Sequence, residues 1–151
     1  MRAARLAPAL YPPLTGEGAR LAGGRWNSPG TPLVYASEHL SLAVLEMLVH
    51  LEPRRLPSNL VAWTLELPDG ASEILDVAQL DPGWRADEFF RPTREIGDQW
   101  VRERRSLALL VPSAIIPAER NVLVNPQHPD LGRLQIVAEE PFGFDPRLLR
   151  T

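Results

Sequence analysis

Three side chains with complementary chemistry lie close together in the first third of the chain. A loop with the sequence GGRWNSPG at positions 23–30 contains Arg25, the strand-like run after it contains Tyr35, and the apolar run that follows contains Glu46. An arginine fork binds phosphate, a tyrosine ring stacks on a planar heterocycle, and a carboxylate stabilises a sugar cation. These residues therefore predict a site that cleaves the glycosidic bond of a nucleotide.

The loop supports this interpretation and also a simpler one. Its adjacent glycines, Gly23 and Gly24, allow the backbone to approach a ligand closely, and the planar guanidinium of Arg25 suits a diphosphate. The same residues are also typical of a turn whose arginine forms a structural salt bridge. Tyr35 is open to the same two interpretations, as a stacking residue or as a core tyrosine.

Glu46 is the only ionisable residue between positions 40 and 49. Helical spacing places it on the face shared with Leu42 and Val49, so it should point inward. A buried carboxylate without a partner is costly and becomes protonated. We therefore expect Arg25 to pair with Glu46 and keep it ionised, with a structural ion pair to another arginine as the alternative.

Other polar residues have simpler expected roles. Ser113 follows a buried strand without the glycine-flanked elbow of a hydrolase nucleophile, so we expect it to be a hydrogen-bonding residue of the site wall. Asn121 and the segment 125–129 have the composition of turns, with His128 as a further candidate for substrate contact. Glu38 is expected in the first turn of a helix, where an acid complements the macrodipole.

The composition restricts the kinds of reaction that are possible. All 16 basic residues are arginine, and the chain contains no cysteine. Schiff-base and P-loop lysines, thiolate nucleophiles, disulfides and cysteine-bound metals are therefore excluded. The histidines, His39, His50 and His128, show no paired spacing, so we expect no metal site.

Length and charge indicate the broad class of protein. The 151 residues fit one domain, 1–151, and the apolar fraction of 44% and charged fraction of 23% are ordinary for a globular protein. With a net charge of −3 and no basic run, we expect no direct binding to nucleic acid. Neither a signal peptide nor a membrane span is recognisable, so we expect a cytoplasmic protein that does not enter the membrane.

Sixteen prolines and ten glycines divide the chain into short elements. The start of the chain, as far as position 30, is expected to be mostly loop with one short strand near Arg5. Two helices are expected, one from an N-cap at Ser37 to about His50 and one from an N-cap at Thr93 to about Arg105. Strand-like runs occupy positions 33–36, 60–67, 74–77, 107–111, 121–124 and 134–137, and a short helix is expected at 146–149. Strands outnumber helices, which predicts a compact α+β domain with a central, mostly antiparallel sheet.

Eight stretches in one order resemble the RES domain family, which is named for its arginine, glutamate and serine positions. They are GEGAR at 16–20, GGRWNSPG at 23–30, VYASE at 34–38, LE at 45–46, IGDQW at 96–100, VPS at 111–113, NPQH at 125–128 and PFGFD at 141–145. The resemblance covers most of the chain. It implies the toxin of a bacterial type II toxin–antitoxin pair that consumes NAD, with a fold similar to ADP-ribosyltransferases and an antitoxin partner that carries an Xre-type helix-turn-helix domain.

The resemblance also implies the catalytic residues. The family's arginine, tyrosine and glutamate match Arg25, Tyr35 and Glu46. Arg25 would hold the diphosphate of NAD and Tyr35 would stack on nicotinamide. Glu46 would stabilise the oxocarbenium-like ribose that forms when nicotinamide departs.

Substrate binding is assigned to five further residues: Arg5, Asn27, Ser28, Ser113 and His128. Ser113 matches the family's serine and would orient Glu46 or a ribose hydroxyl. Arg5 matches an arginine near the family's N-terminus, although the tryptophan that often precedes it is Ala4 here. NAD is expected as the substrate, and no bound cofactor is expected.

The acceptor of the sugar decides the class of reaction, and the sequence leaves it open. Water gives NAD hydrolysis, inorganic phosphate gives phosphorolysis, and a protein side chain gives mono-ADP-ribosylation. We favour NAD degradation because no segment for docking a macromolecular substrate is evident. A module that only binds its antitoxin, without turnover, is a further alternative. A homodimer within a larger assembly is expected, since paired DNA-binding domains require one.

Overall fold

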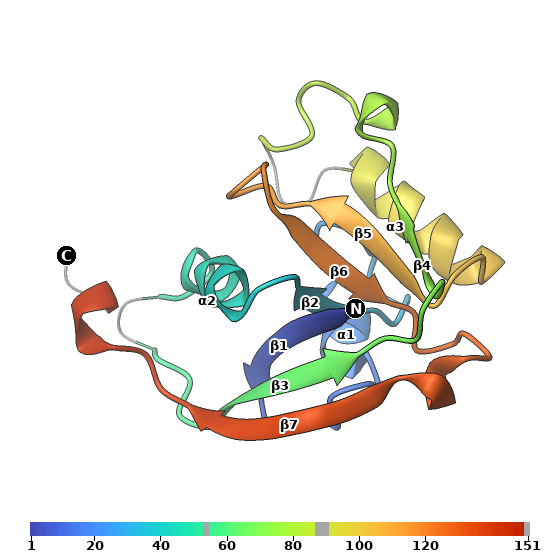
Figure 1. Ribbon diagram of the computed structural model, residues 1–151. Coiled ribbons are helices and arrows are strands. Elements are labelled where there is room, and N and C mark those ends of the chain that lie inside the picture. The colour runs from blue at the N-terminus through green and yellow to red at the C-terminus, as the bar shows by residue number, and fades with distance from the viewer. Residues whose placement is uncertain (53–54, 87–90, 150–151) are drawn as a thin grey trace.

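The chain is built on one seven-stranded sheet (Figure 1). The computed structural model describes residues 1–52, 55–86 and 91–149. The strand order is β4-β5-β6-β2-β1-β3-β7, and every neighbouring pair is antiparallel except β4 and β5. The strands are β1 (Arg2–Pro8), β2 (Val34–Ser37), β3 (Leu60–Glu66), β4 (Ser72–Ile74), β5 (Ala108–Pro112), β6 (Arg120–Val124) and β7 (Gln135–Phe142). The predicted α+β class with a mostly antiparallel sheet is confirmed.

Helices connect these strands and cover parts of the sheet. Within the described ranges they are α1 (Glu17–Ala22), α2 (Leu40–Leu48), α3 (Arg91–Glu103) and the 3-10 helices η1 (Val77–Gln79), η2 (Leu131–Arg133) and η3 (Pro146–Leu149). In Figure 1 the sheet bends strongly, so that β1, β3 and β7 run at a steep angle to β5 and β6. α2 packs against β1 and β2, whereas α3 packs beside β5. No helix in these ranges is long and apolar enough to cross a membrane.

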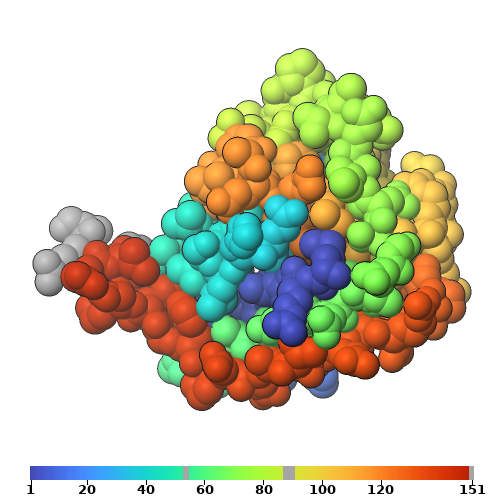
Figure 2. Space-filling view, in the orientation of Figure 1, coloured from blue at the N-terminus to red at the C-terminus, as the bar shows by residue number. Residues whose placement is uncertain are grey.

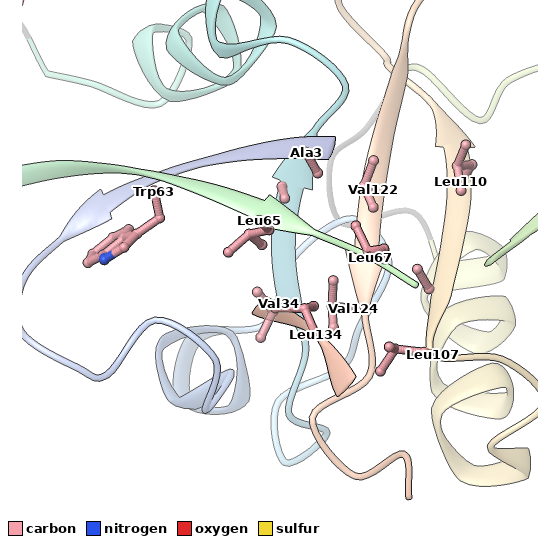
Figure 3. Close-up of a cluster of buried hydrophobic side chains, with 12 residues drawn as sticks. Ala3, Val34, Trp63, Leu65, Leu67, Leu107, Leu110, Val122, Val124 and Leu134 are labelled. Atoms are coloured by element: carbon pink, nitrogen blue, oxygen red, sulfur yellow. The ribbon is translucent and has the colours of Figure 1, made fainter. Parts of the chain in front are cut away.

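The central strands are buried on both faces, which explains their continuous apolar sequences. Along β6, Val122 and Val124 belong to one buried cluster, and Leu123 belongs to another on the opposite face. Figure 3 shows the first cluster, in which side chains from β1, β2, β3, β5 and β6 meet. The second cluster is covered by Trp100 and Val101 of α3. The candidate site lies on this second face.

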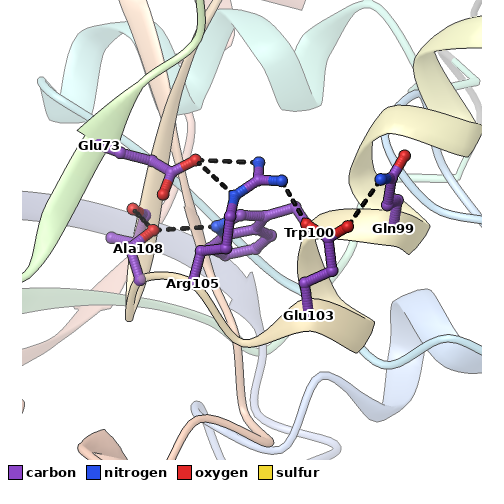
Figure 4. A network of polar contacts seen from close by, with 7 residues as sticks. Glu73, Gln99, Trp100, Glu103, Arg105 and Ala108 are labelled. Carbon is purple, nitrogen blue, oxygen red and sulfur yellow. Dashed lines mark hydrogen bonds and ion pairs between the residues drawn. The ribbon is translucent and has the colours of Figure 1, made fainter.

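A polar network fixes the C-terminal end of α3 to the sheet (Figure 4). Arg105, just after the helix, pairs with Glu73 of β4 at 3.1 Å and also with Glu103. The buried Trp100 donates its indole N–H to the hydroxyl of Ser106 at 2.9 Å. These contacts hold α3 beside β4 and β5.

Both predicted N-caps are wrong. Ser37 is the last residue of β2, and its hydroxyl donates to Asn121 instead of capping a helix. α2 begins after His39, whose side chain makes no capping hydrogen bond. Thr93 lies inside α3 and donates its hydroxyl to the carbonyl oxygen of Arg25 at 2.6 Å. Serine and threonine are typical helix caps, but here both hydroxyls form hydrogen bonds to other parts of the chain.

Two polar residues and one helix also differ from expectation. Glu38 precedes α2 instead of lying in its first turn, and it pairs with Arg120 at 3.8 Å. Asn121 lies in β6 and not in a turn. α1 occupies part of a region that was predicted to be loop. That prediction rested on the glycines of the region, and two of them, Gly16 and Gly23, lie at the ends of the helix with positive φ angles.

Two strands differ from the predicted ranges. The run at 74–77 is divided, since β4 ends at Ile74 and η1 begins at Val77. β7 continues well beyond the predicted 134–137, because it pairs with β3 from Gln135 to Phe142. The remaining strands and the short helix at 146–149 lie close to their predicted positions.

Candidate active site

A cavity of about 1020 Å³ opens between α1, the loop after it, α2 and strand β2. Arg25, Tyr35 and Glu46 all line it. Its volume is at the upper end of the range for small-molecule sites, roughly 300–1000 Å³, and suits a dinucleotide. In the space-filling view, α2 (cyan) lies against the segment that follows β5 (orange) (Figure 2), and Ser113 of that segment donates its hydroxyl to Glu46 of α2.

The loop that carries Arg25 is shaped by contacts within the protein. α1 ends at Gly23, whose φ of 71° suits glycine and whose N–H donates to the carbonyl of Ala19. A Cβ on Gly24 would lie 2.6 Å from the hydroxyl oxygen of Tyr35. Both glycines line the cavity. Gly24 is therefore required for the approach of Tyr35, a different reason from the close ligand approach that the sequence suggested.

Asn27 organises this loop from behind the cavity wall. It is fully buried, and its amide nitrogen donates to the carbonyls of Ala19 and Thr31 at 2.8 and 2.9 Å. Its amide oxygen accepts the hydroxyl of Tyr35 at 2.7 Å. The backbone N–H of the next residue, Ser28, donates to Asp98 of α3 at 2.9 Å. Neither Asn27 nor Ser28 lines the cavity, so the structure places both predicted substrate contacts one layer further back.

Tyr35 lines the cavity and keeps its hydroxyl inside the protein. The hydroxyl donates to Asn27 and accepts the backbone N–H of Trp26 at 3.0 Å. Burial is the main cause that raises the pKa of the Tyr35 phenol well above its usual value. The residue therefore stays neutral, and its ring is the part available for stacking.

Arg25 is held in place by a loop distant in sequence. One of its terminal nitrogens donates to the carbonyl of Trp84 at 2.5 Å, and its guanidinium carbon lies 5.8 Å from the centre of the Trp84 ring. Trp84 is buried and packs against Trp26 with 6.0 Å between ring centres. The expected ion pair with Glu46 is not formed between these two described side chains. The prediction of an arginine partner rested on the cost of a buried carboxylate without a partner, a cost that hydrogen bonds from neutral groups also relieve.

Neutral donors accommodate Glu46 instead. Its Oε1 accepts the hydroxyl of Ser113 at 2.7 Å and the amide nitrogen of Asn121 at 2.6 Å. The Ser113 oxygen in turn accepts the backbone N–H groups of Ile115 and Ile116, both at 3.0 Å. Ser113 therefore directs its proton at Glu46, as a positioning residue does. Within the described residues both hydrogen bonds fall on Oε1, which leaves Oε2 for a ligand.

Like Asn27 and Ser28, the predicted substrate contacts Arg5, Ser113 and His128 do not line the cavity. Arg5 donates to the backbone carbonyl of Tyr35 at 2.9 Å, and its Nε is buried without a partner. Burial lowers the pKa of Arg5 to about 10. Its neighbour Leu6 does line the cavity, and successive residues of a strand point to opposite faces. His128 follows the C-terminal end of β6, whereas Asn121 lies near the beginning of that strand. The Nδ1 atom of His128 accepts the N–H of Asp130.

The cavity also contains residues that sequence reasoning missed as site residues: Asn121, His50 and Arg85. Arg85 follows Trp84 and donates its Nε to the carbonyl of Ala114 at 2.9 Å. An amide next to the buried apolar residues of β6 was a usable signal that Asn121 could be a site residue. The sequence gives no signal for Arg85. It reaches the site because its neighbour Trp84 contacts Arg25, which lies 59 residues earlier in the chain than Trp84.

The fold and the cavity define a small α+β domain in which the loop after α1, strand β2 and helix α2 position an arginine, a tyrosine and a glutamate around one cavity. A sequence model described as RES domain matches residues 1–145. The chain belongs to the RES domain family, as its motifs indicated.

Similar proteins agree with this assignment. The "Prs ADP-ribosylating toxin" of Sphingobium sp. (strain YBL2) is 39% identical over 140 residues, which is 91% of this chain and 87% of that protein. A "Toxin Res" of Photorhabdus laumondii is 39% identical over 138 residues, 91% of this chain and 88% of that protein. The fold is shared with a chain in the crystal structure of the M. tuberculosis MbcT–MbcA toxin–antitoxin complex, with a TM-score of 0.69 and 22% identity over 98% of this chain and 86% of that one.

Proposed function

We propose that this chain is the toxin of a toxin–antitoxin pair and that it cleaves the bond between nicotinamide and ribose in NAD. The names of its relatives support the first part, since they are called toxins. The name of the Sphingobium protein supports the second part, because ADP-ribosylation begins with cleavage of this bond. The similarity in fold to a chain from a toxin–antitoxin complex supports an antitoxin as the partner.

The arrangement of Glu46 is the observation that carries the proposal. Its carboxylate lines the same cavity as Arg25 and Tyr35, and two neutral donors hold one of its oxygens. Hydrogen bonds from neutral groups favour the charged form of a carboxylate without cancelling its charge. A partner arginine would instead compete with the substrate for that charge. Glu46 is therefore suited to stabilise a cation that appears during the reaction.

The reaction follows from these positions. Arg25 and Arg85 bind the diphosphate. The Arg25 side chain is anchored at the carbonyl of Trp84, and the Arg85 side chain at the carbonyl of Ala114. The ring of Tyr35 stacks on nicotinamide. As the bond to nicotinamide breaks, its electrons leave with the base and positive charge develops on the ribose, close to Glu46. The carboxylate interacts more strongly with this transition state than with the substrate, whose ribose is uncharged.

The acceptor is the second part of the proposal. We favour water or inorganic phosphate, which need no docking surface, and a cavity that holds two arginines also suits phosphate. Transfer to a protein side chain is the second candidate, and the name of the Sphingobium relative is the observation that favours it. A module that binds an antitoxin without turnover leaves the organised carboxylate unexplained.

Product analysis tests the proposal. Purified protein is incubated with NAD, with and without inorganic phosphate, and the products are identified by mass spectrometry. Hydrolysis yields nicotinamide and ADP-ribose, phosphorolysis yields nicotinamide and a phosphorylated ADP-ribose, and transfer yields modified protein in a cell extract. If none of these products forms, the chain does not act on NAD.

A further inference from the structure

Ser37 and Asn121 form a buried polar pair beneath Glu46. They are directly opposite each other in the β2–β6 ladder, and their side chains are 3% and 8% exposed. The hydroxyl of Ser37 donates to the amide oxygen of Asn121 at 2.7 Å. Both residues line the cavity, yet neither contributes an ionisable group.

This hydrogen bond determines which side of the Asn121 amide faces Glu46. With its oxygen bound to Ser37, the amide directs its nitrogen at Oε1 of Glu46, 2.6 Å away. The reversed amide would place an oxygen against the carboxylate, and two acceptors that close repel each other. Asn121 is only 8% exposed, so water has little access to the oxygen and nitrogen of a rotated amide.

We propose that Ser37 is a positioning residue that acts on Glu46 through Asn121. Ser37 fixes the amide of Asn121, and the amide holds Oε1 of Glu46 together with Ser113. The carboxylate is thereby kept with Oε2 toward the ribose that becomes positively charged. This role rests on the proposed cleavage of NAD. It adds a contact chain, the hydrogen bonds from Ser37 to Asn121 and from Asn121 to Glu46, which begins at β2, whereas Ser113 follows β5.

The charged groups around the carboxylate do not depend on Ser37. Arg25, Arg85 and His50 line the cavity, and no hydrogen bond between any of them and Ser37 is found among the described residues. Glu38 and Arg120, the sequence neighbours of Ser37 and Asn121, pair with each other at 3.8 Å. Removal of the Ser37 hydroxyl therefore changes the orientation of one amide and leaves these charges in place.

Steady-state kinetics with NAD tests the inference. Ser37→Ala should lower kcat roughly five- to tenfold, the value of one neutral hydrogen bond, with KM unchanged. Ser37→Thr keeps a hydroxyl and suits a strand, so it should retain at least half of kcat. Ser41→Ala, at an exposed serine of α2, is the matched control and should match the parent chain. Equal kcat in Ser37→Ala and the control would overturn the inference.

A double-mutant cycle shows whether Ser37 acts through Asn121. In an Asn121→Ala background the route to Glu46 is already cut, so Ser37→Ala should cause no further loss in kcat. Full, multiplicative losses in the double variant would show that the two residues act independently. That outcome would contradict the proposed chain of contacts.

The amide itself gives a readout that needs no turnover. In NMR spectra of the ¹⁵N-labelled protein, the side-chain amide signals of Asn121 should move in Ser37→Ala and stay in place in Ser41→Ala. Unchanged signals would refute the positioning role. If the signals move but the parent chain does not consume NAD, the contact chain stands and the proposed function fails.

Discussion

At the scale of single residues, the proposed chemistry depends on how the carboxylate of Glu46 is held. Asn121 and Ser113 each donate a hydrogen bond to this carboxylate, and Ser37 donates to Asn121. All three side chains are neutral. Its role as an inward-pointing group was predictable from residue type, because an acid in an apolar helix requires a partner. One partner, Ser113, was predicted from the resemblance to the RES domain family. The other, Asn121, was not predicted, since it has the composition of a turn residue and the sequence favoured arginine.

Ser113→Ala should weaken catalysis less than loss of the Glu46 charge does. The variant removes one of two donors to Oε1, so we expect kcat to fall roughly tenfold. KM should change little, because Ser113 is fully buried and does not line the cavity. Initial rates of NAD loss provide the measurement. A loss as large as that of a carboxylate variant would mean that Ser113 takes a direct chemical part.

Arg85→Ala should separate binding of the diphosphate from binding of nicotinamide. The guanidinium lies in the cavity beyond its contact with Ala114, so its removal should weaken binding of ADP-ribose roughly tenfold. Nicotinamide has no phosphate and should bind as before. Calorimetric titration of both compounds measures the effect, with Arg91→Ala as control, since Arg91 is an exposed arginine of α3 paired with Glu95. Equal binding of ADP-ribose by both variants would exclude Arg85 from the site.

At the scale of elements, the site depends on close contact between α3 and the loop that contains Arg25. The strands of this fold were largely predictable, because continuous apolar runs such as 121–124 are buried on both faces. The helix starts were not, because Ser37 and Thr93 use their hydroxyls between elements. Gly97 looked unremarkable in sequence, yet a Cβ there would lie 1.6 Å from the carbonyl oxygen of Trp26.

Gly97→Ala should therefore destabilise the whole domain. The added methyl group cannot fit between α3 and the backbone of Trp26, and overpacking of this kind lowers the free energy of unfolding by roughly 3 kcal/mol. Gly132→Ala is the matched control, because nothing lies within 4 Å of a Cβ at that position. Denaturant titration followed by tryptophan fluorescence measures both. Equal stabilities would show that α3 does not pack closely on the loop.

At the scale of the whole molecule, the cavity is assembled from parts that are distant in the chain. Arg25 depends on Trp84, Glu46 depends on Ser113 and Asn121, and Tyr35 depends on Asn27. Residue types alone indicated the arginine, tyrosine and glutamate of this site. Arg85 and the supporting contacts become visible only when the fold brings the later two thirds of the chain onto the first third.

Binding of NAD should stabilise the folded chain as one unit. Glu46→Gln keeps the shape of the cavity but turns over slowly, so NAD at a hundred times its dissociation constant should add about 2.7 kcal/mol to the free energy of unfolding. For a domain of this size that raises the melting temperature by roughly 5–10 °C. Thermal unfolding with and without NAD measures the shift. The double variant with Arg25→Ala should lose most of it, and an equal shift there would place the ligand elsewhere.

The most direct test of the account is the concentration of NAD over time with the purified parent chain and with Glu46→Gln. The substitution preserves the size of the side chain and its contacts with neighbouring donors but removes the charge that stabilises the ribosyl cation. We predict that the parent chain consumes NAD and that turnover by Glu46→Gln is slower by a factor on the order of 100 or more. Equal rates in the two proteins, or no consumption of NAD by the parent chain, would contradict the account.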